Sequence, residues 1–600
     1  MSQSNTPAGP GGGTTASFGS PPPGGKTWFG HPRQLALLFT SEMWERFGYY
    51  GMRALLILYL VEHFVFRDNV ANGLYGAFTS LVYLTPLIGG LVADQYFGQK
   101  KAVRLGAVLM SAGYLLLAFS GGDEAKPFVT VADQRYEVVI ERSGEESTQY
   151  VVDGETRRQI SGNEDGSISL DGAGALPATV AAADYEFSAD RNDISVILLF
   201  VSLGLIIVGN GYFKPNISTI VGTLYPEGDR RRDAGFTIFY MGINLGSIIS
   251  QFLAPLIAVK YGYPWGFALA GFGMLLAWAR FQFAGPQLAD YGNPPADGKN
   301  RDAIIVICSL LAIPVVWFLL DNAMKSATVA HEVAATGIVA YFMAQPLLGK
   351  VMFTIYPLAM IGIPIWSVMS LKSVERDKMI VAVVLTFFSV VFWTLFEQAG
   401  SSLTLFADRN TDRNIGDYLM PAGQVQIFNP LFIVIFAPIF SLMWIWLGKR
   451  GLEPSVPLKF AIGLLLVGLG FLVLVFGSRF ADANYLVPLF WLALAYFIHS
   501  LGELCLSPVG LSMITKLSIH KLVGMMMGVW FLSSAMAQYV GGIVAQFAST
   551  ETVGGEVLNN QVSLETYLGV FQTIGIWGMG FGVVLLVLWP FLKRGMHGVN

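Results

Sequence analysis

The sequence has little cysteine and little charge. Its two cysteines, Cys308 and Cys505, both fall in apolar runs, which argues against a disulfide framework. Charged residues account for only 13% of the 600 residues, whereas 54% are hydrophobic and the mean hydropathy is +0.55. This composition excludes a water-soluble enzyme and predicts a helical protein that crosses the membrane many times.

Several motifs are also absent. No G-x-x-x-x-G-K-[ST] phosphate-binding loop occurs, so ATP-driven transport has no support. The histidines, among them His63 and His520, lack metal-ligand spacing, and we expect no metal or other cofactor. Residues 1–34 are rich in glycine, proline and serine without an apolar core, which is typical of a disordered tail and not of a signal peptide. The lipid bilayer is an expected partner, nucleic acid is not, and no partner protein can be named.

Apolar runs of about 20 residues recur along the chain, each long enough to cross about 30 Å of hydrocarbon. We place fourteen spans near residues 35–62, 71–97, 101–120, 193–222, 234–259, 264–284, 302–321, 351–371, 379–407, 425–447, 457–478, 486–514, 523–549 and 565–591. The seventh and eighth carry few charges and are expected to be peripheral. Without them six spans remain on each side of a central break, a layout that resembles the major facilitator superfamily.

This count predicts the domain organisation. We expect a disordered cytoplasmic tail (1–34), an N-terminal six-helix bundle (35–284), a linker with two extra transmembrane helices (285–378), a C-terminal six-helix bundle (379–592) and a short cytoplasmic tail (593–600). Lysine and arginine gather in alternate short loops, which places those loops and both termini in the cytoplasm of a protein of the cell (inner) membrane.

One segment departs from the helical pattern. Residues 121–192 alternate in strand-like fashion and hold fifteen of the 41 acidic residues. By the predicted orientation this is a small external β-rich insertion. It is either a docking or lid element or a loop elaboration that aids solubility, and the second interpretation is the simpler one.

Seven charged side chains lie inside the apolar spans. They are Glu42, Glu45, Arg46, Arg53, Lys214, Glu397 and Glu503. At about 2.5–3.5 kcal/mol each, their insertion would cost roughly 20 kcal/mol, more than the usual stability of about 5–15 kcal/mol. They must therefore be paired, hydrated or used, and they point to transport.

Four of these charges form one stripe on the first span, "TSEMWERFGYYGMRALL". The glutamates, arginines and tyrosines follow one another at three- and four-residue steps, so the stripe runs for about 16 Å along one helix face. A stripe of this length indicates a cavity lining, although a structural ion-pair seam between helices is the alternative.

The remaining charges lie on three later spans. In "GNGYFKPNIS", Gly209, Gly211 and Pro215 predict a broken helix beside Lys214, which could exchange a proton or a carboxylate partner. The alternative is a permanent salt bridge between Lys214 and Glu45. Further along, Trp393 and Glu397 share one helix face, as do His499 and Glu503. His499 could relay protons to Glu503, but a lone histidine is more often satisfied locally.

The two halves carry opposite charge. The first has three cations against two carboxylates, and the second contributes two carboxylates only. A ligand with a carboxylate at one end and an ammonium at the other, such as an amino acid or short peptide, would complement this arrangement. If all seven groups are ionised, the sum is −1, and one bound proton would neutralise it.

Several motifs of the sequence resemble those of one known transporter family. EMWERFGYYG at 42–51 matches in full the E-x-x-E-R-F-x-Y-Y-G motif of the proton-dependent oligopeptide transporters. GNGYFKPN, FTIFYMGINLGS at 236–247, GELCLSP at 502–508 and GLVADQYFGQKK at 90–101 are similar to further family motifs. The resemblance covers both bundles and the two extra spans of bacterial fourteen-span members, but not residues 121–192. The second-span histidine of animal members falls near Gly76, so proton coupling here cannot use it.

The resemblance implies roles for individual residues. Proton coupling falls to Glu42, Glu45, Arg46 and Lys214, and the external gate to Arg53 and Glu397. Peptide binding falls to Arg46, Tyr50 and Lys214 for the carboxylate, to Glu503, Asn429 and Asn244 for the amino terminus, and to Tyr49, Tyr83, Trp393 and Trp530 for side chains. We expect a proton-coupled symporter of di- and tripeptides that works by alternating access. Transport of another small anion or amino-acid-like solute, such as nitrate, and a membrane receptor or sensor are the alternatives.

Overall fold

A computed structural model describes residues 27–599 except 120, 144–145, 227, 230, 296–299, 334–336 and 507–509. A short hairpin of β1 (Thr27–Trp28) and β2 (His31–Pro32) precedes the first helix. The predicted disordered tail is therefore ordered over its last residues, and residues 1–26 lie outside the described part. Thirteen described helical segments are long and apolar enough to cross a membrane. The chain is an integral membrane protein.

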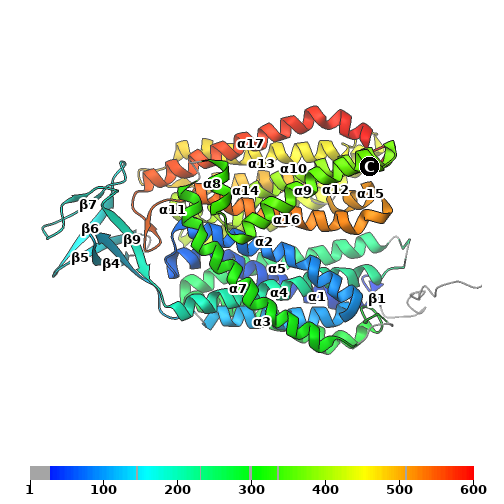
Figure 1. Cartoon of the computed structure of the whole chain (residues 1–600), viewed down its shortest axis with the longest axis horizontal. Coiled ribbons are helices and arrows are strands. Elements are labelled where there is room, and N and C mark those ends of the chain that lie inside the picture. Colours follow the sequence, from blue (N-terminus) through cyan, green and yellow to red (C-terminus); the bar gives the residue numbers. More distant parts are fainter. Residues whose placement is uncertain are drawn as a thin grey trace, which may run out of the picture.

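The helices form two groups (Figure 1). The first group comprises α1 (Gln34–Leu58), α2 (Asp68–Val92), α3 (Gln99–Phe119), α4 (Asp193–Thr223), α5 (Arg231–Tyr261) and α6 (Tyr263–Ala284). The second comprises α10 (Ser373–Phe396), α11 (Ser402–Asn410), α12 (Phe428–Lys449), α13 (Val456–Gly477), α14 (Leu489–Leu506), α15 (Gly510–Leu517), α16 (Val523–Phe547) and α17 (Asn560–Gly595). Helix α1 has the length of a span, and its four charges distinguish it from the thirteen.

The linker contributes α7 (Asp302–Glu332), α8 (Ile338–Ala344) and α9 (Leu347–Ser370). Helix α7 packs against α2 and α4 of the first group, where Ser309 Oγ donates to Tyr212 Oη at 2.9 Å. Helix α9 packs against α10 and α16 of the second group. The two extra spans thus each lie against a different half.

Helix α4 is continuous through Pro215, which corrects the prediction of a broken helix. Its glycines serve close packing instead. A Cβ on Gly89 of α2 would lie 2.0 Å from Gly211 O, and a Cβ on Gly106 of α3 would lie 2.5 Å from Gly209 O. Small residues that let helix backbones approach are typical of membrane bundles.

Glycines also bring the two halves together where α2 crosses α16. A Cβ on Gly76 would lie 2.7 Å from the Cα of Gly542, so neither position has room for a side chain. On the same stretch Asn72 Nδ2 donates to Ala545 O at 3.1 Å, and Gln546 Nε2 donates to Asn69 O at 3.0 Å.

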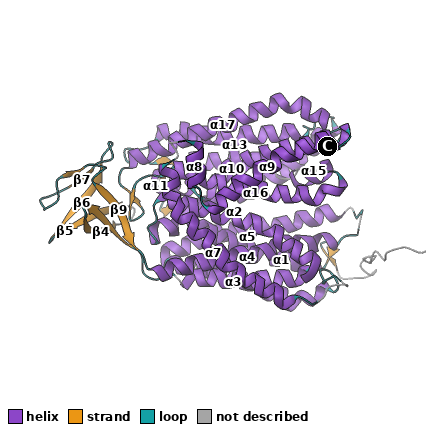
Figure 2. Cartoon of the chain, viewed as in Figure 1, coloured by secondary structure: helices purple, strands orange, loops and turns teal. Residues whose placement is uncertain are grey.

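The insertion is a seven-stranded antiparallel sheet in the order β8-β7-β6-β5-β4-β3-β9. The strands are β3 (Lys126–Val131), β4 (Gln134–Ser143), β5 (Glu146–Asp153), β6 (Thr156–Gly162), β7 (Ile168–Leu170), β8 (Thr179–Val180) and β9 (Tyr185–Asp190). Figure 2 shows it projecting from one end of the bundle, here named the sheet end, and Figure 1 places the C-terminus at the other. The helical bundle with a β-rich insertion confirms the predicted fold class.

Short elements complete the sheet end. β10 (Thr411–Asp412) pairs with β13 (Val487–Pro488), β11 (Asn414–Ile415) with β12 (Tyr418–Leu419), and β14 (Thr552–Val553) with β15 (Glu556–Val557). The last hairpin belongs to the loop between α16 and α17, residues 548–559, which is named the α16–α17 loop.

Candidate functional site

The stripe on α1 is a buried cluster of opposite charges. Arg46 Nε donates to Glu42 Oε1 at 2.8 Å and lies 2.6 Å from Glu45 Oε2, an ion pair without hydrogen-bond geometry. Among the described residues, Glu42 Oε2, both Glu45 oxygens and Arg46 Nη2 have no hydrogen-bond partner. Buried polar atoms are normally paired, so a cluster with this many open positions is suited to accept a proton, water or ligand.

Lys214 of α4 is half-buried, and its Nζ lies 4.3 Å from the ring centroid of Tyr83 on α2. In the part of the chain that the structure describes, no carboxylate comes within 4.0 Å of this nitrogen, and Glu45 pairs with Arg46 instead. A permanent Lys214–Glu45 salt bridge is therefore not what the structure contains. A cation held by a ring alone remains open to an anionic partner.

The aromatic residues of the predicted side-chain pockets are distributed over several helices. Tyr49 and Tyr50 lie edge to face at 5.4 Å, and the Arg46 guanidinium lies 5.8 Å from the Tyr49 ring. Trp393 packs against two phenylalanines of its own helix, and Trp530 of α16 lies next to α15. The structure does not gather them into one described cavity, and their role in binding stays a prediction.

In the second half, Glu503 of α14 is brought together with Asn429 of α12. Asn429 Nδ2 donates to Glu503 Oε2 at 2.9 Å and to Ser500 Oγ at 3.1 Å. Asn244, also predicted here, donates instead to Tyr240 O on its own helix at 3.0 Å. The carboxylate with one amide beside it forms a compact anionic position.

His499 is satisfied locally. Its Nε2 lies 3.0 Å from Val467 O, and its ring packs at 4.6 Å on Phe471. The described contacts favour the structural interpretation over a proton relay to Glu503.

Arg53 and Glu397, the predicted gate, form a buried ion pair between Arg53 Nη2 and Glu397 Oε2. Arg53 Nε also donates to Tyr75 Oη at 2.8 Å. The pair joins α1 of the first half to the short helix η5 (Glu397–Gly400) that follows α10. The family resemblance thus implied a pair of residues separated by more than 340 positions, and the structure contains it.

Sequence reasoning missed a second cluster between the halves. Arg409 of α11 holds Asp68, the first residue of α2, through two hydrogen bonds of 2.5 and 2.8 Å, and both side chains are buried. Thr550 N donates to Asp68 at 3.0 Å, and Arg409 contacts Tyr567 Oη at 3.1 Å. The only signal was a charge at the very end of each apolar run, a position where charges are usually solvated.

These contacts between the halves gather toward the sheet end. Asp68 with Arg409, the α2–α16 bonds and the bond from Gln424 Nε2 to Phe252 O at 2.7 Å all lie there. These hydrogen bonds and this ion pair hold the two halves together at the sheet end.

Comparison with known proteins assigns the chain to a family. The model of the POT family matches residues 100–561, which is more than half of the chain. The chain belongs to the POT family. An uncharacterised transporter, YclF of Bacillus subtilis (strain 168), is 33% identical over 588 residues, which covers 96% of this chain and 97% of that protein. Dipeptide and tripeptide permease A of Escherichia coli (strain K12) is 31% identical over 94% of each chain.

Solved structures agree with this assignment. A crystal structure of a POT peptide transporter in complex with sulfate superposes with a TM-score of 0.69 at 31% identity, over 96% of this chain and 97% of that chain. A mutant of a POT peptide transporter in complex with alafosfalin gives a TM-score of 0.68 at 31% identity, with the same coverage. The comparisons confirm the predicted family, the major facilitator fold, and a transporter that is not an enzyme.

Proposed function

We propose that the chain is a proton-coupled symporter of di- and tripeptides. The observation that carries the proposal is that each half holds one charged position that can accept a ligand, and that the two positions have opposite charge. Lys214 with Arg46 offers cations to a peptide carboxylate, and Glu503 with Asn429 offers an anion to a peptide amino terminus. Relatives named as dipeptide and tripeptide permeases and as peptide transporters support this substrate class.

Proton coupling follows from the incomplete pairing on α1. Protonation of Glu45 would weaken its ion pair with Arg46 and free the guanidinium for a peptide carboxylate. Lys214 lacks a carboxylate partner among the described residues and can take one from either the substrate or Glu45. Binding of the proton to Glu45 would thus promote binding of the peptide carboxylate to Arg46 in the same cluster. Glu42 would hold Arg46 in place through its hydrogen bond.

The gate follows from the ion pair between Arg53 and Glu397. Because the pair joins the two halves, it forms when the sheet end is closed and breaks when that end opens. It therefore favours the closed conformation by the difference in its interaction energy between the two states. With both termini in the cytoplasm, the sheet end is external, and this structure then corresponds to an inward-facing state. The transport cycle would alternate between closure at this end and closure at the other.

The test is uptake of labelled dipeptide by proteoliposomes with an inward proton gradient. We expect accumulation against the peptide gradient, loss of accumulation when the proton gradient is dissipated, and competition by unlabelled di- and tripeptides. Blocking the amino group of a competing dipeptide should weaken its competition in the parent protein, and the same block should cause a smaller loss in Glu503→Gln, which has already lost that contact.

The same assay separates the alternatives. Accumulation of nitrate or a free amino acid without any competition by peptides would replace the proposed substrate. Binding of peptide without any uptake would indicate a receptor instead of a transporter. A control variant, Glu375→Gln, removes an exposed carboxylate at the start of α10 and should leave uptake unchanged.

A further inference from the structure

The insertion, residues 121–192, is anchored to the first half by more than its two chain connections. Arg191 donates to Phe64 O at 2.6 Å and also to Val65 O, at the end of the first span. Arg67 forms an ion pair with Glu186 of β9. These bonds hold β9 and the adjoining edge of the sheet against the segment between α1 and α2.

The insertion is also bonded to the second half, through the α16–α17 loop. Gly162 N donates to Leu558 O at 3.2 Å, and Asn559 Nδ2 donates back to Gly162 O at 3.0 Å. Val553 of the same loop is 1% exposed, because it completes the apolar core of the sheet together with residues such as Val129 and Ile160. The loop is therefore packed into the insertion as well as hydrogen-bonded to it.

A third contact links the sheet to the α16–α17 loop, next to the cluster of Asp68 and Arg409. Tyr185 Oη of β9 lies 2.9 Å from Glu551 Oε2 on the α16–α17 loop. The neighbouring Thr550 binds Asp68 and Arg409, the buried cluster that joins the two halves. A displacement of the loop would thus break contacts both with the sheet and with that cluster.

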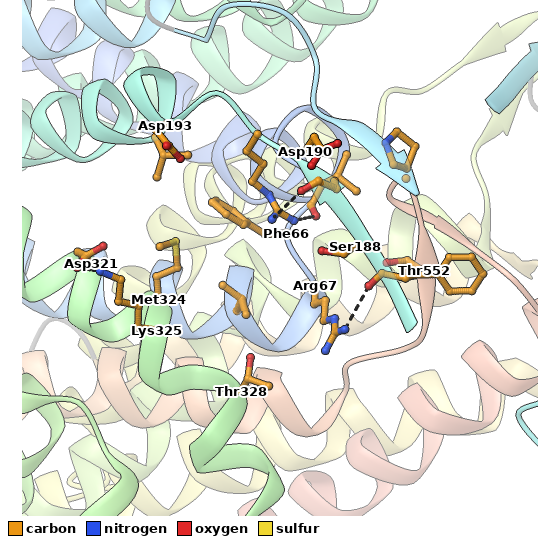
Figure 3. Close-up of a pocket in the computed structure, with 18 of the residues that line it drawn as sticks. Phe66, Arg67, Ser188, Asp190, Asp193, Asp321, Met324, Lys325, Thr328 and Thr552 are labelled. Atoms are coloured by element: carbon orange, nitrogen blue, oxygen red, sulfur yellow. Dashed lines mark hydrogen bonds and ion pairs between the residues drawn. The ribbon is translucent and has the colours of Figure 1, made fainter. Parts of the chain in front are cut away.

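Between these attachments the sheet does not lie flat on the helices. A cavity of about 750 Å³ separates β9 from α4 and α7, and a second of about 1060 Å³ lies between the sheet and Ser549–Thr552. Figure 3 shows the first cavity, with Asp321 and Lys325 on one side, and Ser188, Asp190 and Thr552 on the other. The insertion is held at separate points and not by one continuous interface.

We propose that the insertion is a strap that ties the two halves together at the sheet end, so that this end opens only after the strap releases the α16–α17 loop. The inference rests on the proposed alternating-access function, because only a protein whose halves separate needs such a contact to break. It assigns a conformational role to a segment that the family motifs do not cover. The points of attachment make release feasible, because each can break without unfolding the sheet.

A reversible cross-link tests the strap. A Cβ on Gly162 would lie 2.8 Å from Leu558 Cβ, close enough for a disulfide after a small shift. In a background with Cys308→Ser and Cys505→Ser, the pair Gly162→Cys and Leu558→Cys is oxidised and then reduced. Spin labels at the exposed positions Tyr261 and Ala483, one in each half, report the width of the sheet end.

We expect oxidation to hold the label distance at its shortest value at every pH, with or without peptide, and to lower peptide uptake at least tenfold. Reduction should restore both readouts. The control disulfide, Ser161→Cys with Ser169→Cys, joins facing residues of β6 and β7 within the insertion and should change neither.

Weakened attachment gives the opposite test. Asn559→Asp keeps the oxygen that caps α17 but loses the donor to Gly162, and Tyr185→Phe removes the hydroxyl beside Glu551. Together they should raise the fraction open at the sheet end by about three- to tenfold. Tyr136→Phe, which removes a hydroxyl that donates to Gln134 within the sheet, should leave the open fraction unchanged.

Two results would overturn the strap: a cross-linked protein that still opens or transports normally, and a reduced protein that is never wider than the oxidised one. If the parent protein takes up no peptide, the proposed substrate fails instead. The label distances then decide on the strap alone.

Discussion

Two buried clusters of charge differ in how completely their polar atoms are paired. In the cluster that joins the halves, both carboxylate oxygens of Asp68 accept hydrogen bonds from Arg409, and Thr550 adds its backbone N–H. In the α1 cluster, both oxygens of Glu45 and one of Glu42 accept no hydrogen bond from the described residues. Both clusters are buried. In the first, only Arg409 Nε lacks a partner among the described residues, whereas the α1 cluster leaves three carboxylate oxygens and one guanidinium nitrogen without one.

The difference separates two uses of a buried charge. A fully hydrogen-bonded pair recovers much of its desolvation penalty in one geometry and therefore holds that geometry. A partly satisfied group gains from any new partner, so its pairing changes easily with protonation or ligand binding. We infer that Asp68 with Arg409 holds one conformation, and that Glu42, Glu45 and Arg46 respond to the proton and the substrate.

The largest expected effect is on the cluster of Asp68 and Arg409. Arg409→Leu would leave the Asp68 carboxylate buried without its cation, which should destabilise the protein by about 3–5 kcal/mol. Adding Asp68→Leu should recover most of that loss, because neither charge then remains. The measurement is the midpoint of unfolding in detergent. Arg157→Leu, which breaks an exposed ion pair with Glu141, is the control and should cost less than about 1 kcal/mol.

The α1 cluster should show the reverse behaviour. Glu45→Gln should lower proton-driven accumulation about 100-fold, since the site can no longer exchange a proton. It should leave peptide exchange between equal pools measurable and the unfolding midpoint nearly unchanged, because Glu45 has no hydrogen bond with the described residues to lose and Arg46 keeps its ion pair with Glu42. Normal accumulation by this variant would remove Glu45 from the coupling mechanism.

The gate pair is expected to fall between these two cases. Arg53→Ala and Glu397→Ala should each shift the equilibrium toward opening at the sheet end, by about 1–3 kcal/mol. Exchange of the two charges in one double variant should recover closure better than either single reversal. The readout is labelling of cysteines introduced at the sheet end. Strictly additive changes, without recovery in the exchange, would show that the two residues do not act as a gate.

The smallest expected effect is a pH dependence of the strap. Burial raises the pKa of Glu551 above its ordinary value of 4.5, while the hydrogen bond from Tyr185 and the charge of Arg67 act to lower it. Burial, Glu551 and Asp165 raise the pKa of the neighbouring Tyr185. The single hydrogen of Tyr185 is shared between Gly166 O at 2.7 Å and Glu551, so a protonated Glu551 can donate to the phenol oxygen while Tyr185 donates to Gly166. Protonation therefore favours the strapped state.

The sign of this effect follows from the raised pKa. The added stability is complete below pH 4.5 and is lost as the pH rises through the higher pKa of the strapped state. Because Glu551 is partly exposed, the open fraction should change only about twofold. Label distances across this range test it, and Glu551→Gln should abolish the dependence. An equal dependence in Glu551→Gln would assign it to another group.

The spans, the β-rich insertion and the presence of functional charges inside the spans could be predicted from the sequence. Apolar runs fix where helices cross a membrane, and charges inside them are too costly to be accidental. The pairing of Arg53 with Glu397 and the place of Asn429 beside Glu503 were implied by family motifs, and neither has a local signal of its own.

What could not be predicted depended on packing between distant segments. The glycines beside Pro215 indicate a break when read locally, but in the bundle they admit neighbouring backbones and α4 stays helical. Asp68 and Arg409 lie at span ends, where a charge normally faces water, and only the meeting of the halves buries them. The contact of Asn559 with Gly162 likewise joins segments that no periodicity relates.

The glycine crossing of α2 and α16 has a mechanical consequence. Helices that interlock through ridges and grooves must lift side chains over one another to rotate, whereas Gly76 and Gly542 present no ridge. The two helices can therefore rotate against each other at this crossing, which lies near the sheet end. The part of α16 from Gly542 back to Val523 is about 28 Å long, so a rotation of about 10° at the crossing moves the Val523 end by about 5 Å. A single methyl group at Gly76 would lie 2.7 Å from the Gly542 Cα, so it would force the two helices apart where they cross and hinder the rotation.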